Sequence, residues 1–508
     1  MIDGHILLFC HAAWGHTRPI CTFASRLVKL QPFHVTLITS PSLVDKVHLE
    51  ISRSFDAHEH ARHDLIRVVS LSFEAVPFAL EAVEVPFREI YERLLNKEPI
   101  SCAVKGTSFP PVPPPTCAIL DFFAVHPFRT IRSLSPQTKI LAWQSGSSSY
   151  LFREYGPAEQ GGHMASLAGK RFEETLAGLF TNITGELVTL PGLPPMYDHE
   201  FFPQPSPPGF EAPLTLMHLA GFEVINNCDG IVQTTDASYD TPGIRAIDAW
   251  MSSLSPPRPL YNIGPQLPHS HPSEARSGEL EQTRGAGDVL AFLDKTLASH
   301  GAESLVYIAF GSIFGPWMQP DRLWTILDVL MEHNVPFILS HAAPFAVIPD
   351  DVAAKVKEFD LGFLSSWTPQ QTILNHPVTG WFITHCGQNS ASESLAAGVP
   401  LIAWDFAADQ PVTALGLTVL GVAYQLFEVR APPHGLKPIH RLGTDKHLTG
   451  TVDAVRTEIT ELLTKMKGDD GAEKRRNARR VRAELEASMA EGGRARGEMH
   501  RLIADLAA

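Results

Sequence analysis

A histidine and an aspartate, each placed directly after an apolar segment, are the residues of this chain best suited to proton transfer. His16 follows the apolar segment 5–11 in a short turn, and Asp121 follows the apolar segment 117–120. The unperturbed pKa of histidine lies near neutrality, so His16 can act as a general base. An adjacent carboxylate would fix its tautomer and stabilise the imidazolium. The two residues are a candidate dyad; the alternatives are a capping histidine and a helix-capping aspartate.

A polar turn in the second half of the chain has the chemistry of an anion site. Residues 385–390 (HCGQNS) stand between an apolar segment, 381–384, and a short helical segment. Gly387 allows a tight backbone turn, and Asn389 or Ser390 can cap the helix. The free N–H groups at such a helix start point outward and attract anions.

The charged residues around this turn indicate which anion it would take. The stretch 367–410 contains Glu393, Asp405 and Asp409 but no lysine or arginine. An anion would therefore be held by N–H dipoles, hydroxyl groups and His385 instead of salt bridges. A nucleotide diphosphate fits this description. The alternative is that His385 is simply a buried residue at the end of a strand.

The elements predicted around these residues place both groups at the edges of parallel sheets. Residues 5–11, 17–30 and 34–39 have the pattern of strand, helix and strand, and 381–384 and 401–404 are strands on either side of the second helix. Such units build parallel sheets, whose ligands bind at the carboxyl ends of the strands. The predicted fold class is α/β.

The chain is too long for a single hydrophobic core. Its 508 residues predict two domains of roughly 250 residues each. A polar run without hydrophobic periodicity, 268–287, is the expected linker between domains at 1–267 and 288–490. Residues 491–508 form a helical C-terminal segment.

Composition limits the partners and the location. A net charge of −14 argues against nucleic acid or an anionic membrane surface as a partner. The six cysteines lack C-x-x-C spacing, which is typical of reduced thiols in an intracellular protein. No leader-like segment and no run of roughly 20 apolar residues is present. We therefore expect a cytoplasmic protein without a transmembrane segment.

The stretch 367–410 resembles the donor-binding box of the UDP-sugar-dependent glycosyltransferases that glycosylate small molecules, best known from plant natural-product enzymes. It begins with Trp-x-Pro-Gln, has His-Cys-Gly-x-Asn-Ser at its centre and a glutamate on the helix, and ends in Asp-Gln at the family's spacing. The resemblance implies the GT-B fold, in which two Rossmann-like parallel-sheet domains face a cleft. The donor would be bound mainly by the second domain and the acceptor by the first.

The resemblance also implies roles for the positions of the box. Trp367 would stack on the uracil, and Gln370 with Glu393 would reach the ribose. Asp409 and Gln410 would hold hydroxyl groups of the sugar. The remaining donor-binding residues, around the diphosphate and the sugar, are Ser312, His385, Gly387, Gln388, Asn389 and Ser390.

Three of these positions have alternatives. Gln388 stands where plant enzymes usually have a second tryptophan near the sugar, so other sugars remain open beside glucose, which Gln410 favours. Trp367 taken alone could be a core aromatic residue. Glu393 stands three residues after Ser390, which is also the spacing of a capping box.

By the same resemblance, Gly15-His16 and Asp121 match the catalytic base and the residue that orients it. The implied reaction is a metal-independent, inverting transfer from a UDP-sugar to a hydroxyl group of a small lipophilic or phenolic acceptor. Trp14, Phe122 and Trp143 are expected to line an apolar acceptor pocket. No cofactor is expected, and the last helix would cross back onto the first domain.

Three sequence motifs of other nucleotide-binding proteins are missing, which reduces the number of protein classes to consider. The chain has no D-x-D, no G-x-x-x-x-G-K-[ST] and no G-x-G-x-x-G after a strand. These absences argue against a metal-dependent glycosyltransferase fold, a P-loop ATPase and a redox dinucleotide. A UDP-sugar epimerase and a non-catalytic UDP-sugar-binding protein of the same architecture remain as alternatives.

Overall fold

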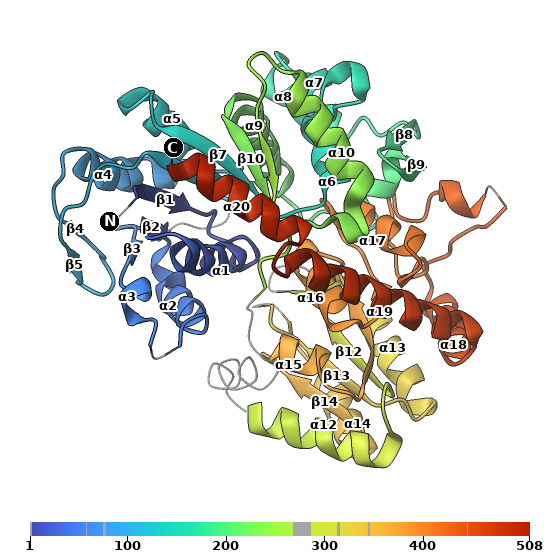
Figure 1. Cartoon of the computed structure of the whole chain (residues 1–508). Helices are drawn as coiled ribbons and strands as arrows, with labels where there is room; N and C mark the ends of the chain where they lie inside the picture. The colour runs from blue at the N-terminus through green and yellow to red at the C-terminus, as the bar shows by residue number, and fades with distance from the viewer. Residues whose placement is uncertain are drawn as a thin grey trace.

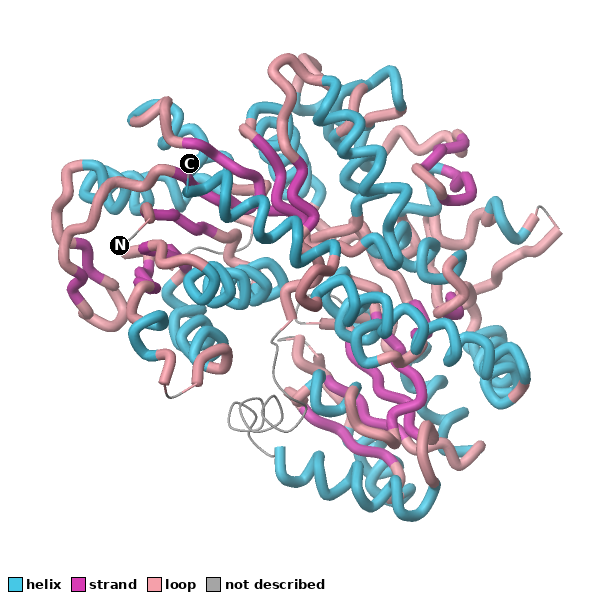
Figure 2. The backbone as a smooth tube through the Cα atoms, viewed as in Figure 1, coloured by secondary structure: helices cyan, strands magenta, loops and turns pink. Residues whose placement is uncertain are grey.

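The computed structural model describes residues 3–56, 58–74, 78–267, 286–311, 315–343, 346–443 and 445–507, which form two α/β domains (Figure 1). Each domain contains a parallel sheet flanked by helices (Figure 2). The predicted fold class, two Rossmann-like domains, is confirmed. No helix in the described ranges combines the length and the apolar character that crossing a membrane requires.

The first sheet has seven parallel strands in the order β11-β10-β7-β6-β1-β2-β3. In β1, Leu7 and Phe9 belong to the core on one face, while Ile6 and Leu8 belong to the core on the other. Burial on both faces explains why this strand is a continuous apolar segment in the sequence. The strands are β1 (His5–Phe9), β2 (His34–Thr39), β3 (Ile66–Ser70), β6 (Cys117–Asp121), β7 (Lys139–Gln144), β10 (Gly230–Gln233) and β11 (Leu260–Asn262).

Helices cover both faces of this sheet, and two short hairpins lie outside it. The hairpins pair β4 (Ile100–Ser101) with β5 (Ser108–Phe109) and β8 (Leu187–Leu190) with β9 (Leu193–Tyr197). The helices are α1 (Trp14–Leu30), α2 (Val44–Ser52), α3 (His60–His63), α4 (Glu84–Leu95), α5 (Val125–Leu134), α6 (Ser148–Tyr155), α7 (His163–Leu167), α8 (Phe172–Phe180), α9 (Glu211–Asn227) and α10 (Ala237–Ser253).

The second sheet has six parallel strands in the order β14-β13-β12-β15-β16-β17. They are β12 (Leu305–Ala309), β13 (Phe337–Ser340), β14 (Gly362–Ser365), β15 (Thr379–Thr384), β16 (Leu401–Ala403) and β17 (Ala423–Gln425). The helices of this domain are α12 (Ala286–His300), α13 (Asp321–Glu332), α14 (Asp350–Phe359), α15 (Gln370–Leu374), α16 (Gln388–Ala397) and α17 (Gln410–Val419). The strand, helix, strand unit predicted within 367–410 is β15–α16–β16.

The chain ends in three helices, α18 (Val452–Lys467), α19 (Asp469–Met489) and α20 (Arg494–Ala507). Figure 1 shows α20 lying along the first domain. Its residues Leu502 and Ile503 are part of a first-domain core, and Tyr261 donates a hydrogen bond to Asp505 at 2.6 Å. Of the expected linker, 268–287, residues 268–285 lie outside the described residues. Helix α12 begins at Ala286, inside the predicted bounds of the linker.

Candidate active site between the two domains

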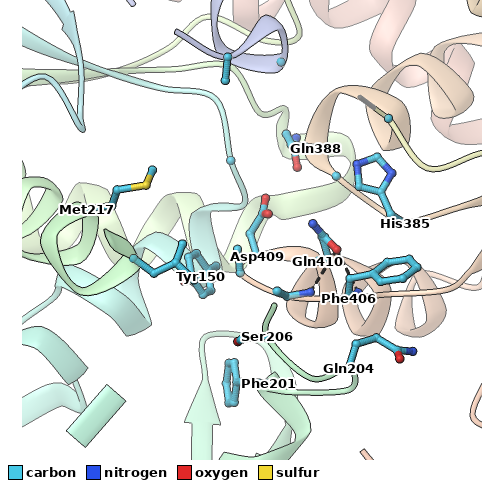
Figure 3. Close-up of a pocket in the computed structure, with 18 of the residues that line it drawn as sticks. Tyr150, Phe201, Gln204, Ser206, Met217, His385, Gln388, Phe406, Asp409 and Gln410 are labelled. Atoms are coloured by element: carbon cyan, nitrogen blue, oxygen red, sulfur yellow. Dashed lines mark hydrogen bonds between the residues drawn. The ribbon is translucent and has the colours of Figure 1, made fainter. Parts of the chain in front are cut away.

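A cavity of about 1560 Å³ is lined by residues at the strand ends of both sheets. It exceeds the roughly 300–1,000 Å³ of a usual small-molecule site, so it has room for two substrates. Part of it is shown in Figure 3. Ten of the predicted donor-binding residues line it: Trp367, Gln370, His385, Gly387, Gln388, Asn389, Ser390, Glu393, Asp409 and Gln410. The eleventh, Ser312, lies outside the described residues.

His16 and Asp121 come together because β1 and β6 are neighbouring parallel strands. Asp121 is the last residue of β6 and is fully buried, and His16 lies in the first turn of α1. Nδ1 of His16 donates to Oδ2 of Asp121 at 2.6 Å, which leaves Nε2 as the proton acceptor. Oδ1 of Asp121 accepts from the N–H of Phe123 at 3.0 Å. Asp121 therefore caps the following turn and also holds His16.

Burial and charge act in opposite directions on the pKa of each partner. Burial lowers the pKa of His16, but the Asp121 carboxylate and the hydrogen bond to it outweigh burial and raise the pKa above its usual value. Burial likewise acts to raise the pKa of Asp121, and His16 outweighs it, so that this pKa lies below its usual value. The pair therefore favours imidazolium next to carboxylate, the state that follows proton uptake by His16.

A proline in α1 creates a backbone contact between the domains. The helix begins at Trp14, earlier than predicted, and contains Pro19. Proline has no N–H to bond the carbonyl four residues before it, which belongs to Gly15. That carbonyl instead accepts a hydrogen bond from Nδ2 of Asn389 in the second domain. The contact joins the residue next to His16 to the start of α16.

The start of α16 presents N–H groups that none of the described side chains caps. Gly387 is the N-cap residue, and Asn389 and Ser390 both lie within the first turn, so the prediction that one of them caps the helix is wrong. A β-carbon on Gly387 would come within 2.5 Å of Nε2 of His385, so this position requires glycine. Burial lowers the pKa of His385 to about 4, so its imidazole is neutral near pH 7. An uncapped helix start beside a neutral N–H donor suits an anion.

Glu393 belongs to a charged network that crosses between the domains. Its Oε2 accepts from Nε2 of Gln370 at 2.6 Å, and its Oε1 accepts from Nη1 of Arg18 at 2.5 Å. Arg18, on α1, also donates to Oε1 of Glu50 at 3.2 Å. The capping box with Ser390 is not formed, because the helix begins before Ser390. Both oxygens of Glu393 are engaged, and its side chain is only 2% exposed.

The cations of the cavity come from both domains, but none belongs to the donor box. The first domain contributes Arg18, Lys46, Arg53 and Arg153, and the second contributes Arg322. Nζ of Lys46 lies 5.1 Å from the ring centroid of Trp367 and 5.8 Å from that of Trp14. Sequence reasoning missed these cations, because their distance from the box along the chain gives no local signal.

Three polar residues lie together at the position expected for the sugar: Asp409, Gln410 and Gln388 (Figure 3). Oε1 of Gln410 accepts from two backbone N–H groups just before α17, at 3.0 and 3.2 Å. Its Nε2 donor is used by none of the hydrogen bonds found among the described residues. Nε2 of Gln388 donates to the hydroxyl of Tyr239 at 3.0 Å. Burial raises the pKa of Asp409 to about 6, so its carboxyl group changes charge near that pH.

The first-domain wall of the cavity contains several aromatic residues. Phe122, as predicted, lines it, and the Phe122 ring stacks on His16 with centroids 6.1 Å apart. Other apolar and aromatic lining residues come from 150–235, where the sequence pattern predicted no pocket residues: Tyr150, Tyr155, Phe180, Phe201, Phe202, Phe210 and Met217.

One residue expected in the acceptor pocket lies elsewhere. Trp143 on β7 is fully buried and packs against Phe23 with centroids 5.1 Å apart, in the core on the other face of the sheet. Its neighbour Gln144 lines the cavity instead, because successive side chains alternate across a strand. Trp14, like Phe122, lines the cavity, and Nζ of Lys46 lies over its ring as well as over that of Trp367.

Within the described ranges, no group of three or more His, Cys, Asp or Glu side chains is arranged to hold a metal ion.

Known proteins resemble this chain in sequence and in fold. The family model for UDP-glucoronosyl and UDP-glucosyl transferases matches residues 288–437. The UDP-glycosyltransferase eriJ of Hericium erinaceus is 30% identical over 495 residues, which cover 91% of this chain and 90% of eriJ. The (R)-mandelonitrile beta-glucosyltransferase of Prunus dulcis is 26% identical over 80% of this chain and 81% of its own length.

A solved structure shares the whole architecture. UGT2 of Phytolacca americana, determined with UDP-2-fluoro-glucose and pterostilbene, superposes with a TM-score of 0.69 at 20% identity and covers 99% of this chain and 100% of its own. This likeness establishes the GT-B fold. Together with the similarity to eriJ along almost the entire length of both proteins, it shows that the chain belongs to the UDP-glycosyltransferase family and is an enzyme that transfers a sugar from a UDP-sugar.

Proposed function

We propose that this enzyme transfers glucose from UDP-glucose to a hydroxyl group of a small apolar or phenolic acceptor, with inversion at the anomeric carbon and without a metal ion. One observation carries the proposal. The His16–Asp121 pair lies in a wall of the cavity that contains several aromatic residues, and the uncapped start of α16 belongs to the other domain.

In the proposed reaction, Nε2 of His16 takes the proton of the acceptor hydroxyl. The acceptor oxygen forms a bond to the anomeric carbon while the bond from that carbon to the phosphate oxygen of UDP breaks. Negative charge then grows on the diphosphate, where the N–H groups at the start of α16 and the neutral imidazole of His385 would stabilise it. Asp121 stabilises the imidazolium.

The arrangement of the two domains supports inversion. The base belongs to α1 of the first domain, and the anion site belongs to α16 of the second. An acceptor activated by the first domain would approach the anomeric carbon from the side opposite to the diphosphate. A single displacement of this kind inverts the configuration of that carbon.

Residues at the two ends of the cavity support the choice of substrates. Asp409 can accept hydrogen bonds from sugar hydroxyls, and Nε2 of Gln410 can donate one, which suits glucose. The Prunus dulcis relative is named as a glucosyltransferase. The aromatic residues of the first-domain wall suit a planar, apolar acceptor, and the Phytolacca americana structure contains pterostilbene.

The remaining parts of the proposal concern the metal and the location. The helix start, together with first-domain cations such as Arg18, Lys46 and Arg53, can neutralise a diphosphate, so activity is expected to survive EDTA. A cytoplasmic location is proposed from the six cysteines, all of which are buried and unpaired.

The experiment measures UDP release by the purified protein from UDP-glucose and other UDP-sugars, with a panel of phenols and alcohols and with EDTA. Acceptor-dependent release that is fastest with UDP-glucose is the expected result, and NMR of the product should show a β-linkage formed from the α-linked donor. The His16→Ala variant is the control for proton transfer. An α-linked product would refute inversion, and loss of activity in EDTA would refute metal independence.

A further inference from the structure

A second pair of histidine and carboxylate stands in the cavity that holds His16. Glu154 on α6 and His218 on α9 both line this cavity. Nδ1 of His218 lies 2.9 Å from Oε1 of Glu154. Arg153 donates to the other oxygen, Oε2, at 2.9 Å. The proposed transfer reaction uses none of these three side chains, so their role needs a separate explanation.

The two members of the pair differ in exposure. The side chain of Glu154 is 4% exposed, whereas that of His218 is 19% exposed. Burial acts to raise the pKa of Glu154, but His218 and other neighbours, Arg153 among them, outweigh burial and hold this pKa well below its usual value. Glu154 is therefore a buried anion that supports His218, and a ligand would meet the imidazole.

The position of the carboxylate determines which nitrogen of His218 can accept a hydrogen bond. Nδ1 and Oε1 approach closely without the alignment of a full hydrogen bond. A lone pair on Nδ1 would nevertheless face a carboxylate oxygen, so the tautomer with the proton on Nδ1 is favoured. Nε2 then carries the lone pair, and no hydrogen bond among the described residues uses it. A ligand group at this position must therefore donate a hydrogen bond.

Aromatic and polar side chains both lie near this pair. The ring of Phe180 lies 6.4 Å from the ring of His218, centroid to centroid. His163 is the other nearby imidazole, but its Nδ1 is 3.9 Å from Oε1 of Glu154, which is too long for a hydrogen bond. In the part of the chain that the structure describes, these side chains do not form a group able to hold a metal ion.

We propose that His218, oriented by Glu154, binds a second hydroxyl group of the acceptor, distant from the hydroxyl that receives the sugar. The favoured acceptors are then diols or polyphenols that have an apolar body and a hydroxyl group near each end. His218 determines acceptor specificity, and Glu154 is a positioning residue. The inference rests on the proposed function, because His16 defines the end of the acceptor that reacts.

The test compares acceptors that differ only in the distal hydroxyl. The probes are 4-alkylphenols of increasing chain length and the same phenols with a terminal hydroxyl group. We measure kcat/KM from UDP release, the position of the sugar by NMR, and the Kd of each probe by calorimetry in the presence of UDP. At one chain length the terminal hydroxyl should raise kcat/KM about 10-fold, since it then reaches a charge-supported acceptor.

The variants separate binding from packing. His218→Phe keeps an aromatic ring but removes Nε2, so the preference for the hydroxylated probe should fall to about unity. Glu154→Gln should reduce the preference while retaining part of it. His126→Phe is the matched control: its Nδ1 lies 3.0 Å from a glutamate, Glu84, and its side chain is 18% exposed, but it does not line the cavity. A purely structural role would lower kcat/KM for both probes equally.

Two results would overturn the inference. The first is that the ratio of kcat/KM for the hydroxylated probe to that for the plain probe is the same in wild type and His218→Phe at every chain length. The second is that His126→Phe lowers this ratio as much as His218→Phe does. If no phenol receives a sugar, the proposed function fails, and the calorimetry still decides whether the distal hydroxyl is bound through His218. Tighter binding of the hydroxylated probe in wild type, lost in His218→Phe, would support the inference in that case too.

Discussion

Asp121→Asn exchanges the buried carboxylate beside His16 for an amide of the same size. In the wild type, Oδ2 accepts from His16, and Oδ1 accepts from the N–H of Phe123 at 3.0 Å. The backbone donor requires an oxygen, so the asparagine must place its carbonyl there and turn its NH₂ group toward His16. Nδ1 of His16 would then have to accept, and its proton would move to Nε2. The base would lose the lone pair that it needs.

The expected loss follows from this change of tautomer. General-base catalysis contributes about 10²- to 10⁴-fold, and the corresponding exchange in a serine protease triad costs about 10⁴-fold. We expect Asp121→Asn to lower kcat/KM by roughly 10²- to 10⁴-fold, close to the effect of His16→Ala. Asp121→Ala imposes no tautomer and should retain more activity than Asp121→Asn, although it removes more atoms.

The pH dependence gives a second readout. His16 accepts a proton only while neutral, and Asp121 raises its pKa above the usual value. The wild-type kcat/KM should therefore fall as the pH drops through that raised pKa. Loss of the negative charge at 121 removes the largest contribution that raises the pKa of His16, so the acidic limb of the profile should move to lower pH in both variants.

The assay is UDP release over a range of pH, with UDP binding and thermal unfolding measured to exclude a folding defect. Full activity in a folded Asp121→Asn protein, or an acidic limb at the wild-type position, would refute the assignment of His16 as the base. Higher activity in Asp121→Asn than in Asp121→Ala would refute the tautomer argument alone.

Three further predictions concern the donor. Trp367→Ala should weaken UDP binding about 5- to 100-fold in calorimetry, because the uracil loses its stacking partner. Unchanged affinity would show that the uracil does not stack on Trp367. Arg18→Met should weaken UDP-glucose binding roughly 10-fold, because the carboxylates of Glu393 and Glu50 would lose this cation in a cavity that must hold a negatively charged donor; tighter binding would contradict this. Burial raises the pKa of Asp409 to about 6, so the affinity for UDP-glucose relative to UDP should decrease as the pH falls through 6. Asp409→Asn should make that ratio independent of pH.

Local patterns predicted the elements that carry the donor box. Alternation of apolar strands and amphipathic helices indicates parallel sheets, and β15–α16–β16 formed where the pattern of 367–410 placed it. Gly398 ends α16 in the left-handed conformation, with a φ of 72°, which a side chain would disfavour. Such features depend on residues close together in the chain, so they can be read from the sequence.

The cap of α16 and the location of Trp143 could not be predicted in this way. Asn389 is directed to the carbonyl of Gly15, which Pro19 leaves free, and the proline belongs to another domain. Trp143 lies on the face of β7 that packs in the core with Phe23, and Gln144 lines the cavity, because successive side chains alternate across the strand; the pattern of the strand does not say which face the ligand occupies. A shift of one residue would exchange the two faces.

Local spacing and a rule common to all parallel sheets predicted the α/β class, the donor box and the placement of His16 and Asp121 after strands. The contact of Arg18 with Glu393 and that of His218 on α9 with Glu154 on α6 could be seen only in the folded chain. These contacts join segments far apart in the chain. They form only when the packing of whole domains and helices brings the segments together, and no local pattern encodes that arrangement.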